Sequence, residues 1–256
     1  MTSLQFEIFS NFRNEFRSYC LALNGRLGGL LSPLQKEASK KDTPDYPIET
    51  PVVYNTALDE LTEQSDIRLI VIGDNPGKDE QRAFNQKYLV GQSGKIAAGF
   101  FAKNAEFQTD FRKNVIILNK TPVHTAKTNH LKYILKNGSE EVKKLISESQ
   151  VYMAQRTAKM HQDLCRAAGE AGIAPELWLV GYAELKGKGL FLGYRDELKN
   201  SYENAASEWE KVFVFQHFSM NRFSIDLKTF MSKNRSLGIV DASHELGKIH
   251  KQEIFG

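Results

Sequence analysis

Residues 67–95 read IRLIVIGDNPGKDEQRAFNQKYLVGQSGK, and this stretch decides the fold that the rest of the chain must adopt. It opens with the apolar residues 69–72 and then breaks at the GDNPG sequence of residues 73–77. Glycine, proline and asparagine together favour a tight turn there. Because open α/β sheets present their chemistry on strands that end in such turns, we expect a buried strand whose end carries a carboxylate and an amide.

Three later apolar runs have the character of buried strands. They are residues 114–118, 177–180 and 211–215. The segments between the strands have helical spacing, at residues 96–107, from 139 to about 169–172, and at 196–209. Strands that alternate with helices indicate a parallel sheet with right-handed crossovers and helices on both faces. The predicted fold class is therefore α/β, a three-layer α/β/α sandwich around a four-stranded parallel sheet.

The two ends of the chain are expected to lie outside this core. Residues 3–23 have apolar side chains at helical spacing, and Asn24-Gly25 is a typical helix stop. Residues 32–50 are rich in proline, lysine and serine, which favours an exposed connection. After a closing helix at 225–231, the chain is polar beyond about 236 and is expected to be loosely held. We therefore divide it into an N-terminal helix and connection (1–50), a core domain (51–236) and a C-terminal tail (237–256).

Composition narrows the class of protein. The chain has 256 residues, of which 41% are hydrophobic and 25% are charged, as in an ordinary globular protein. A formal charge of +3 permits a polyanionic partner but is too small to indicate one. The two cysteines, Cys20 and Cys165, exclude a disulfide framework and a four-cysteine metal cage made by this chain alone. Without a signal-peptide pattern or a membrane-length apolar run, we expect a cytoplasmic protein with no membrane partner.

Candidate site residues follow each predicted strand. They are Asp74 and Asn75, then Asn119, then Gly181, and finally His217 with Ser219. Each has an ordinary structural explanation, since Asn75 can form a turn, Asn119 can cap a helix and His217 can be a buried structural histidine. However, the C-terminal ends of parallel strands share one edge of the sheet, where ligands bind. Taken together, the four strand ends favour a site.

Three other patterns do not by themselves indicate a site. Gly91-Gln92-Ser93-Gly94-Lys95 resembles part of a phosphate loop, but Ile96 replaces the required serine or threonine. The basic residues 123–138 are typical of a solvated loop, although a phosphate contact is an alternative because they follow Asn119. His124 and His130 lack metal-ligand spacing, so we expect solvated side chains and no metal.

In order and spacing, these motifs resemble the uracil-DNA glycosylase superfamily over about residues 51–230. GDNPG is similar to the G-x-N-P-G motif of the mismatch-specific and single-strand-selective monofunctional branches, and residues 52–55 resemble the latter branch. Lys78-Asp79-Glu80 and residues 89–94 are similar to the motifs of the iron–sulfur branch, family 4, whose cysteines this chain lacks. Asn119 matches the asparagine that reads the base, and residues 217–221 match the H-P-S motif and its loop.

The resemblance implies a monofunctional glycosylase that hydrolyses the N-glycosidic bond of uracil, or of a related deaminated base, in DNA during base excision repair. It implies no cofactor or metal, a monomer, and single- or double-stranded DNA as the partner. Catalytic roles would fall to Asn75, which holds water, to His217, which donates to the base, and to Asp74, which gives general-base or electrostatic help. The implied base-binding residues are Gly73, Pro76, Gly77, Tyr88, Leu89, Asn119 and Ser219. The implied DNA contacts are Ser93, Lys95, Met220, Asn221 and Arg222.

The chain departs from the family pattern at two positions. Leu89 stands where the family has a phenylalanine that stacks on the base, and Tyr88 or Phe84 could take over this role. Phe218 replaces a proline that stiffens the His217 loop. Residues 220–223 would wedge into DNA, with core packing as the alternative for Met220 and Phe223. Two other functions stay open: a non-catalytic nucleic-acid-binding protein of this fold, and an α/β enzyme that acts on nucleotides or nucleosides.

Overall fold

The four predicted strands form a parallel sheet in the computed structural model, which describes residues 1–170 and 172–256. The strand order is β2-β1-β3-β4, and Gly73 pairs in register with Asn119 at the end of β1. Every strand residue is buried except Glu176, as expected for a sheet covered on both faces. The strands are β1 (Leu69–Gly73), β2 (Val115–Asn119), β3 (Glu176–Val180) and β4 (Val212–Phe215).

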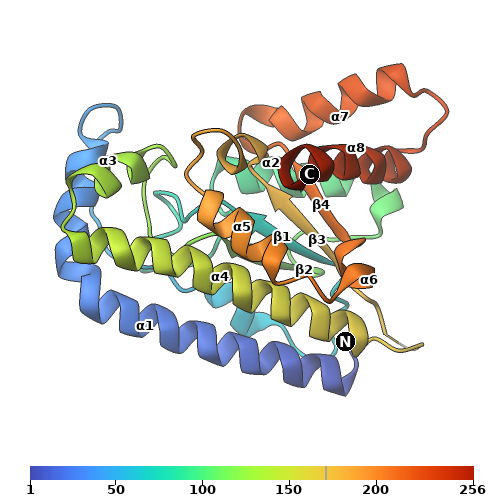
Figure 1. Cartoon of the computed structure of the whole chain (residues 1–256), viewed down its shortest axis with the longest axis horizontal. Coiled ribbons are helices and arrows are strands. Elements are labelled where there is room, and N and C mark those ends of the chain that lie inside the picture. Colours follow the sequence, from blue (N-terminus) through green and yellow to red (C-terminus); the bar gives the residue numbers. More distant parts are fainter. Residues whose placement is uncertain (171) are drawn as a thin grey trace.

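Helices cover both faces of the sheet, so the predicted three-layer α/β/α sandwich is confirmed (Figure 1). One layer comprises α2 (Gln92–Lys103), α7 (Arg222–Lys233) and α8 (Ile239–Phe255). The Trp178 ring of β3 packs against this layer. Its centroid lies 5.6 Å from that of Phe101 in α2 and 5.8 Å from that of Phe223 in α7. The other layer comprises α1 (Ser3–Ser39), α4 (Glu140–Arg166) and α5 (Leu192–Asn200).

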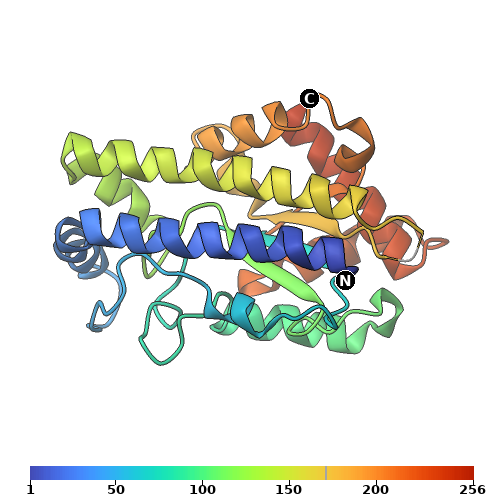
Figure 2. The same cartoon turned by 90° about the horizontal axis from the view of Figure 1, so that it is seen from below.

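Helix α1 is longer than predicted, because it continues through Asn24-Gly25 and Pro33 to Ser39. A glycine inside a helix costs about 1 kcal/mol, but the buried stripe continues beyond it through Leu27 and Leu31, so tertiary packing outweighs local propensity. Figure 2 shows α1 and α4 side by side and antiparallel, and the rings of Tyr19 and Tyr152 stack between them at 3.7 Å. Residues 32–39 of the predicted exposed connection at 32–50 are therefore helix.

The C-terminal residues are also helical instead of loosely held. Helix α8 packs on β4, where the His244 ring stacks on Phe213 with the ring centroids 4.9 Å apart. His244 Nε2 also bonds the Glu176 carboxylate at 2.7 Å, which fastens the helix to β3. The polar composition misled the prediction because only one face of α8 is buried.

The remaining helices differ from prediction mainly at their ends. Helix α4 begins at Glu140, one residue after the predicted start at Ser139, which caps it. It ends at Arg166, before the predicted end at 169–172; residue 171 lies outside the described residues. The predicted helix at 196–209 is divided between α5 and α6 (Ala206–Trp209). The predicted loop at 123–138 contains α3 (His130–Asn137).

Short 3-10 turns are η1 (Thr56–Glu60), η2 (Ala105–Phe107), η3 (Tyr182–Leu185) and η4 (Ser219–Asn221). No helix in the described ranges has the length and apolarity to cross a membrane.

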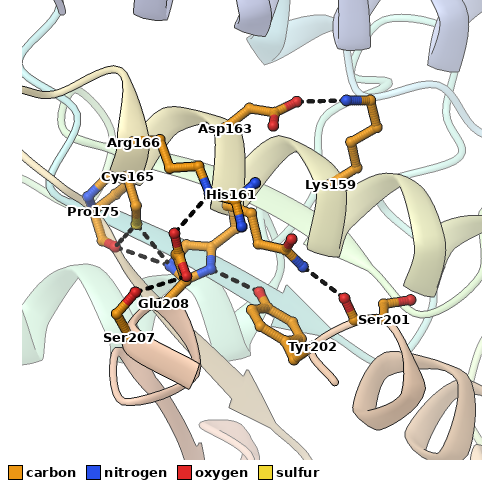
Figure 3. A network of polar contacts seen from close by, with 11 residues as sticks. Lys159, His161, Asp163, Cys165, Arg166, Pro175, Ser201, Tyr202, Ser207 and Glu208 are labelled. Atoms are coloured by element: carbon orange, nitrogen blue, oxygen red, sulfur yellow. Dashed lines mark hydrogen bonds and ion pairs between the residues drawn. The ribbon is translucent and has the colours of Figure 1, made fainter. Parts of the chain in front are cut away.

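A buried polar network joins α4 to the region of α5 and α6 beside the N-terminal end of β3 (Figure 3). His161 Nε2 lies 3.0 Å from the Pro175 carbonyl, which can only accept, so Nε2 carries a proton. His161 Nδ1 then accepts from the Tyr202 hydroxyl at 2.6 Å. Burial lowers the pKa of His161 to about 4, and the ring therefore stays neutral at physiological pH.

Candidate functional site

The C-terminal ends of the strands open onto a cavity of about 520 Å³, within the range of small-molecule sites. Residues from all four strand ends line it, which is the convergence that the sequence predicted. The predicted site residues on its wall are Asp74, Asn75, Gly77, Leu89, Ser93, Asn119, His217, Ser219, Met220 and Arg222. We refer to it as the strand-end cavity.

Asn75 is held in a fixed orientation with one atom left free. Its Nδ2 donates to Thr125 Oγ1 at 2.8 Å, and Thr125 Oγ1 in turn donates to the Lys127 carbonyl at 2.9 Å. This contact assigns the other amide atom, Oδ1, as an acceptor, and Oδ1 is buried without a hydrogen-bond partner among the described residues. Buried polar atoms are nearly always paired, so an unpaired acceptor on a cavity wall indicates a place for a ligand or water.

Asn119 supplies a second free polar atom. Its Nδ2 is buried and has no partner within residues 1–170 and 172–256. The side chain folds over Gly73 on the neighbouring strand, where a Cβ atom would lie only 2.4 Å from Asn119 Oδ1. Gly73 is therefore required for the position of Asn119, although it does not itself line the cavity.

His217 presents a donor to the same space. The Ser219 backbone amide lies 3.0 Å from Nδ1 and the Ser219 hydroxyl lies 2.8 Å away. Because an amide N–H can only donate, Nδ1 accepts, and the neutral ring carries its proton on Nε2. Burial lowers the pKa of His217, while Asp74 partly offsets this effect and Lys120 and Arg222 add to it. The ring is thus a neutral donor at pH 7.

Asp74 forms a buried ion pair with Lys120, a partner that the sequence analysis did not assign. Lys120 Nζ lies 2.6 Å from Asp74 Oδ1 and also donates to the carbonyls of Val180 at 2.6 Å and Gly73 at 3.3 Å. Gly181 leaves room for the pair: its φ is +96°, and a Cβ there would lie 2.3 Å from Asp74 Oδ1. Among the described residues, the other oxygen of Asp74, Oδ2, has only a long hydrogen bond, 3.4 Å, from Thr128 Oγ1.

Glu80 is another carboxyl group on the wall, which Asp79 and Glu184 also line. Its side chain accepts from the Gly77 amide at 3.1 Å and is almost fully buried. Burial raises the pKa of Glu80 to about 7, and the hydrogen bond from Gly77 opposes this rise. The cavity wall therefore includes a carboxyl group paired with lysine, at Asp74, and a carboxyl group whose pKa lies near neutral pH, at Glu80.

The structure separates the three candidates for stacking on a base. Leu89 lines the cavity and has a φ of +52°, which a turn beside α2 imposes. Tyr88 is buried away from the cavity, and its hydroxyl donates to the Val53 carbonyl at 2.6 Å. Phe84 is 77% exposed and is not on the cavity wall. The predicted roles of Tyr88 in binding and of Tyr88 or Phe84 in stacking therefore do not fit the structure.

The loop after β4 is anchored by Phe218. This side chain is fully buried, with its ring 5.1 Å from Phe223 and 6.1 Å from Phe111. Packing thus supplies the stiffness that the missing proline would have given. Beyond the anchor, Met220 is 68% exposed with a φ of +52°, whereas Phe223 is buried in the core. The alternative of core packing is wrong for Met220 and correct for Phe223.

The remaining predicted residues lie beside the cavity. Lys95 and Asn221 line a neighbouring groove, and the Pro76 carbonyl accepts from the Thr125 amide at 3.1 Å. His124 and His130, predicted to be solvated, are both buried. His124 Nδ1 donates to the Pro76 carbonyl at 2.9 Å and Nε2 accepts from Tyr46 at 2.9 Å, so this ring supports the GDNPG turn.

Sequence analysis missed Lys120 and Thr125 as parts of the site, and it did not assign Glu80 a role. A lysine directly after an apolar strand was the available signal for Lys120, because a cation placed there needs a buried partner. The described residues include no group of three or more His, Cys, Asp or Glu side chains arranged for a metal ion. Comparisons of the chain with family models, with curated proteins and with solved structures found no match.

Proposed function

We propose that this chain is a monofunctional DNA glycosylase of the uracil-DNA glycosylase type, which hydrolyses the N-glycosidic bond of uracil or a related deaminated base in DNA. One observation carries the proposal: the free Oδ1 of Asn75, the free Nδ2 of Asn119 and the neutral His217 ring meet in one cavity. The order of motifs that resembles the superfamily supports the same reaction.

His217 supplies the electrostatic part of the reaction. When the N-glycosidic bond breaks, positive charge develops on the sugar and negative charge on the departing base. A donor that is fixed before the reaction stabilises such a charge by about 3 kcal/mol. His217 Nε2–H would donate to the pyrimidine O2, and the contact from Ser219 to Nδ1 fixes both the tautomer and the ring.

Asn119 supplies recognition of the base. An amide group offers a donor and an acceptor side by side, which suits the O4 and N3–H edge of uracil and mismatches the corresponding edge of cytosine. The free Nδ2 would donate to O4, so binding of uracil would satisfy a polar group that is otherwise unpaired.

The attacking water would bind to Asn75 Oδ1, which is an acceptor without an acidic proton of its own. Asp74 directly precedes Asn75 in the chain, and one of its oxygens is already bound by Lys120. The other oxygen, Oδ2, is left to orient the water or to receive its proton. These contacts support a division in which Asn75 holds the water and Asp74 is its charged neighbour.

DNA, as opposed to a free nucleoside, is favoured by the rim of the cavity. Met220 projects there with most of its surface exposed, next to Arg222. An exposed apolar side chain beside a base-sized cavity can occupy the space that a flipped nucleotide leaves in the stack, and Arg222 can bind a phosphate.

The experiment is a glycosylase assay on labelled oligonucleotides that contain uracil, hypoxanthine, xanthine or mismatched thymine, both single- and double-stranded. Heating in alkali breaks the strand at each abasic site. We expect strand breaks at uracil and free uracil in the supernatant. Binding without strand breaks would instead favour a non-catalytic nucleic-acid-binding protein, and absence of DNA affinity at low salt would favour an enzyme of free nucleotides.

A further inference from the structure

A second hollow, the α2–α7 groove, adjoins the strand-end cavity. It has a volume of about 530 Å³ and lies between α2 and α7, with α8 at one end. In Figure 1 these three helices lie together on one face of the sheet. The apolar side chains on its wall are Ile96, Phe100, Leu227, Met231 and Ile239.

Positive charge borders this apolar floor. Lys95 and Lys103 of α2 and Lys228 of α7 line the groove, and all three are exposed. None of them forms an ion pair with a described residue. Among the described residues that line the groove, none is aspartate or glutamate. Its charge is therefore complementary to an anion.

The groove adjoins the strand-end cavity. Gln92, at the start of α2, lines both. Asn221 lines the groove, while its chain neighbours Met220 and Arg222 line the cavity. A polymer that places one unit in the cavity would thus pass over residues 220–222 directly into the groove.

We propose that the α2–α7 groove binds a nucleotide that flanks the target base on an unpaired DNA strand. Its base would lie on the apolar floor, and its phosphates would contact the lysines. This rests on the proposed function and adds a substrate class to it: single-stranded or locally melted DNA. An intact duplex would offer only phosphates to the groove, because its bases are paired, whereas an unpaired strand offers apolar base faces as well.

Length dependence of uracil excision tests this inference. Single-stranded oligonucleotides would carry uracil with a fixed flank on one side and a flank that grows one nucleotide at a time on the other, in both polarities. For the wild type, kcat/KM is expected to rise once the flank on one side reaches the groove. In Lys103→Glu/Lys228→Glu, the increase in kcat/KM with flank length should be about tenfold smaller.

A matched control separates the groove from general charge effects. Lys113→Glu/Lys233→Glu makes the same change in net charge at two exposed lysines that line neither cavity. The control should keep the full dependence on length. Equal losses in both double variants, or a wild type without any dependence on flank length, would overturn the groove inference while uracil excision itself still stood.

Binding gives a second readout that does not require turnover. Fluorescence anisotropy with a labelled oligothymidylate lacking uracil should show about tenfold weaker binding for Lys103→Glu/Lys228→Glu than for the control. For the groove variant, the slope of the logarithm of the binding constant against the logarithm of the salt concentration should be smaller in magnitude by about 1.4. Each of the two lost phosphate contacts contributes about 0.7 on a single strand. Equal DNA binding by the two variants would overturn the proposal and leave the groove to another occupant, such as an acidic amphipathic helix. A wild type that binds oligothymidylate but excises no base would contradict only the proposed function.

Discussion

Lys120 Nζ lies 2.6 Å from Asp74 Oδ1, and neither side chain reaches solvent to any large extent. The pair stands where β1 and β3 meet, and Lys120 also bonds the Val180 carbonyl at 2.6 Å. Burial lowers the pKa of Lys120, and the Asp74 carboxylate opposes this effect. The pair therefore holds the first motif of the candidate site against the neighbouring strand.

The first prediction concerns this pair. Lys120→Met leaves the Asp74 carboxylate buried without its cation, and we expect a loss of about 3–5 kcal/mol in the free energy of unfolding. The double variant Lys120→Met/Asp74→Asn removes both charges and should recover most of that loss. Urea unfolding of the four proteins gives the coupling energy. Additive effects of the two substitutions would show that the pair is not energetically coupled.

The second prediction separates stability from activity at Asn119. Its Nδ2 is already unpaired, so Asn119→Ala removes no hydrogen bond made by that atom and should change the free energy of unfolding by less than about 1 kcal/mol. Excision of uracil should nevertheless fall by about 10²-fold or more, because the base loses its recognition partner. Thermal melts and single-turnover excision measure the two effects. A variant that is strongly destabilised would mean that Asn119 serves the fold.

The third prediction concerns Met220 as a wedge. The side chain is 68% exposed, so Met220→Ala should leave the melting temperature unchanged. Removing a base from a stacked duplex costs a few kcal/mol, and a single strand has less stacking to break. We therefore expect Met220→Ala to reduce excision from duplex DNA by about tenfold more than excision from single strands. Equal effects on both substrates would argue against a wedge.

The fourth prediction concerns the pH dependence of stability. Burial lowers the pKa values of His124 and His161 to about 4 from the ordinary value of 6.5. Between these values the unfolded chain binds protons that the folded chain does not. The free energy of unfolding therefore falls as pH decreases from 6.5 towards 4, by up to about 1.4 kcal/mol per pH unit for each histidine.

Glu80 acts in the opposite direction. Burial raises its pKa from 4.5 to about 7, so the folded chain holds a proton between these values that the unfolded chain has released. This contribution makes the protein less stable as pH rises through that window. Glu80→Gln removes this opposing contribution. As the pH decreases from 6.5 to 4.5, the free energy of unfolding of this variant should therefore fall more steeply than that of the wild type. Urea unfolding across this window measures both slopes, and identical slopes would contradict the assignment.

Local sequence patterns predicted the strands because each is a short, fully apolar run bounded by turn residues. The site residues at their ends could be predicted for the same reason, since parallel strands bring Asn75, Asn119 and His217 to one edge. Helices α1 and α8 could not be delimited in this way. Gly25 and the polar tail have poor local propensity, and only contacts with α4 and β4 make those residues helical.

Partners that are distant in sequence explain the other differences. His124 lies at the start of the basic stretch 123–138, yet it is buried because Tyr46, 78 positions away, and the Pro76 carbonyl satisfy its ring. Lys120 and Asp74 likewise pair only because β1 and β2 are neighbours. Phe218 takes the place of a stiff proline through rings of Phe111 and Phe223, which lie outside the motif.

The most direct test of the central claim is the release of free uracil from a uracil-containing oligonucleotide under single-turnover conditions, measured for the wild type, Asn75→Ala and His217→Ala. We predict free uracil and an abasic strand from the wild type, with rates reduced by at least about 10²-fold in each folded variant. No uracil from the folded wild type, or unchanged release from both variants, would contradict the claim that these residues form the active site.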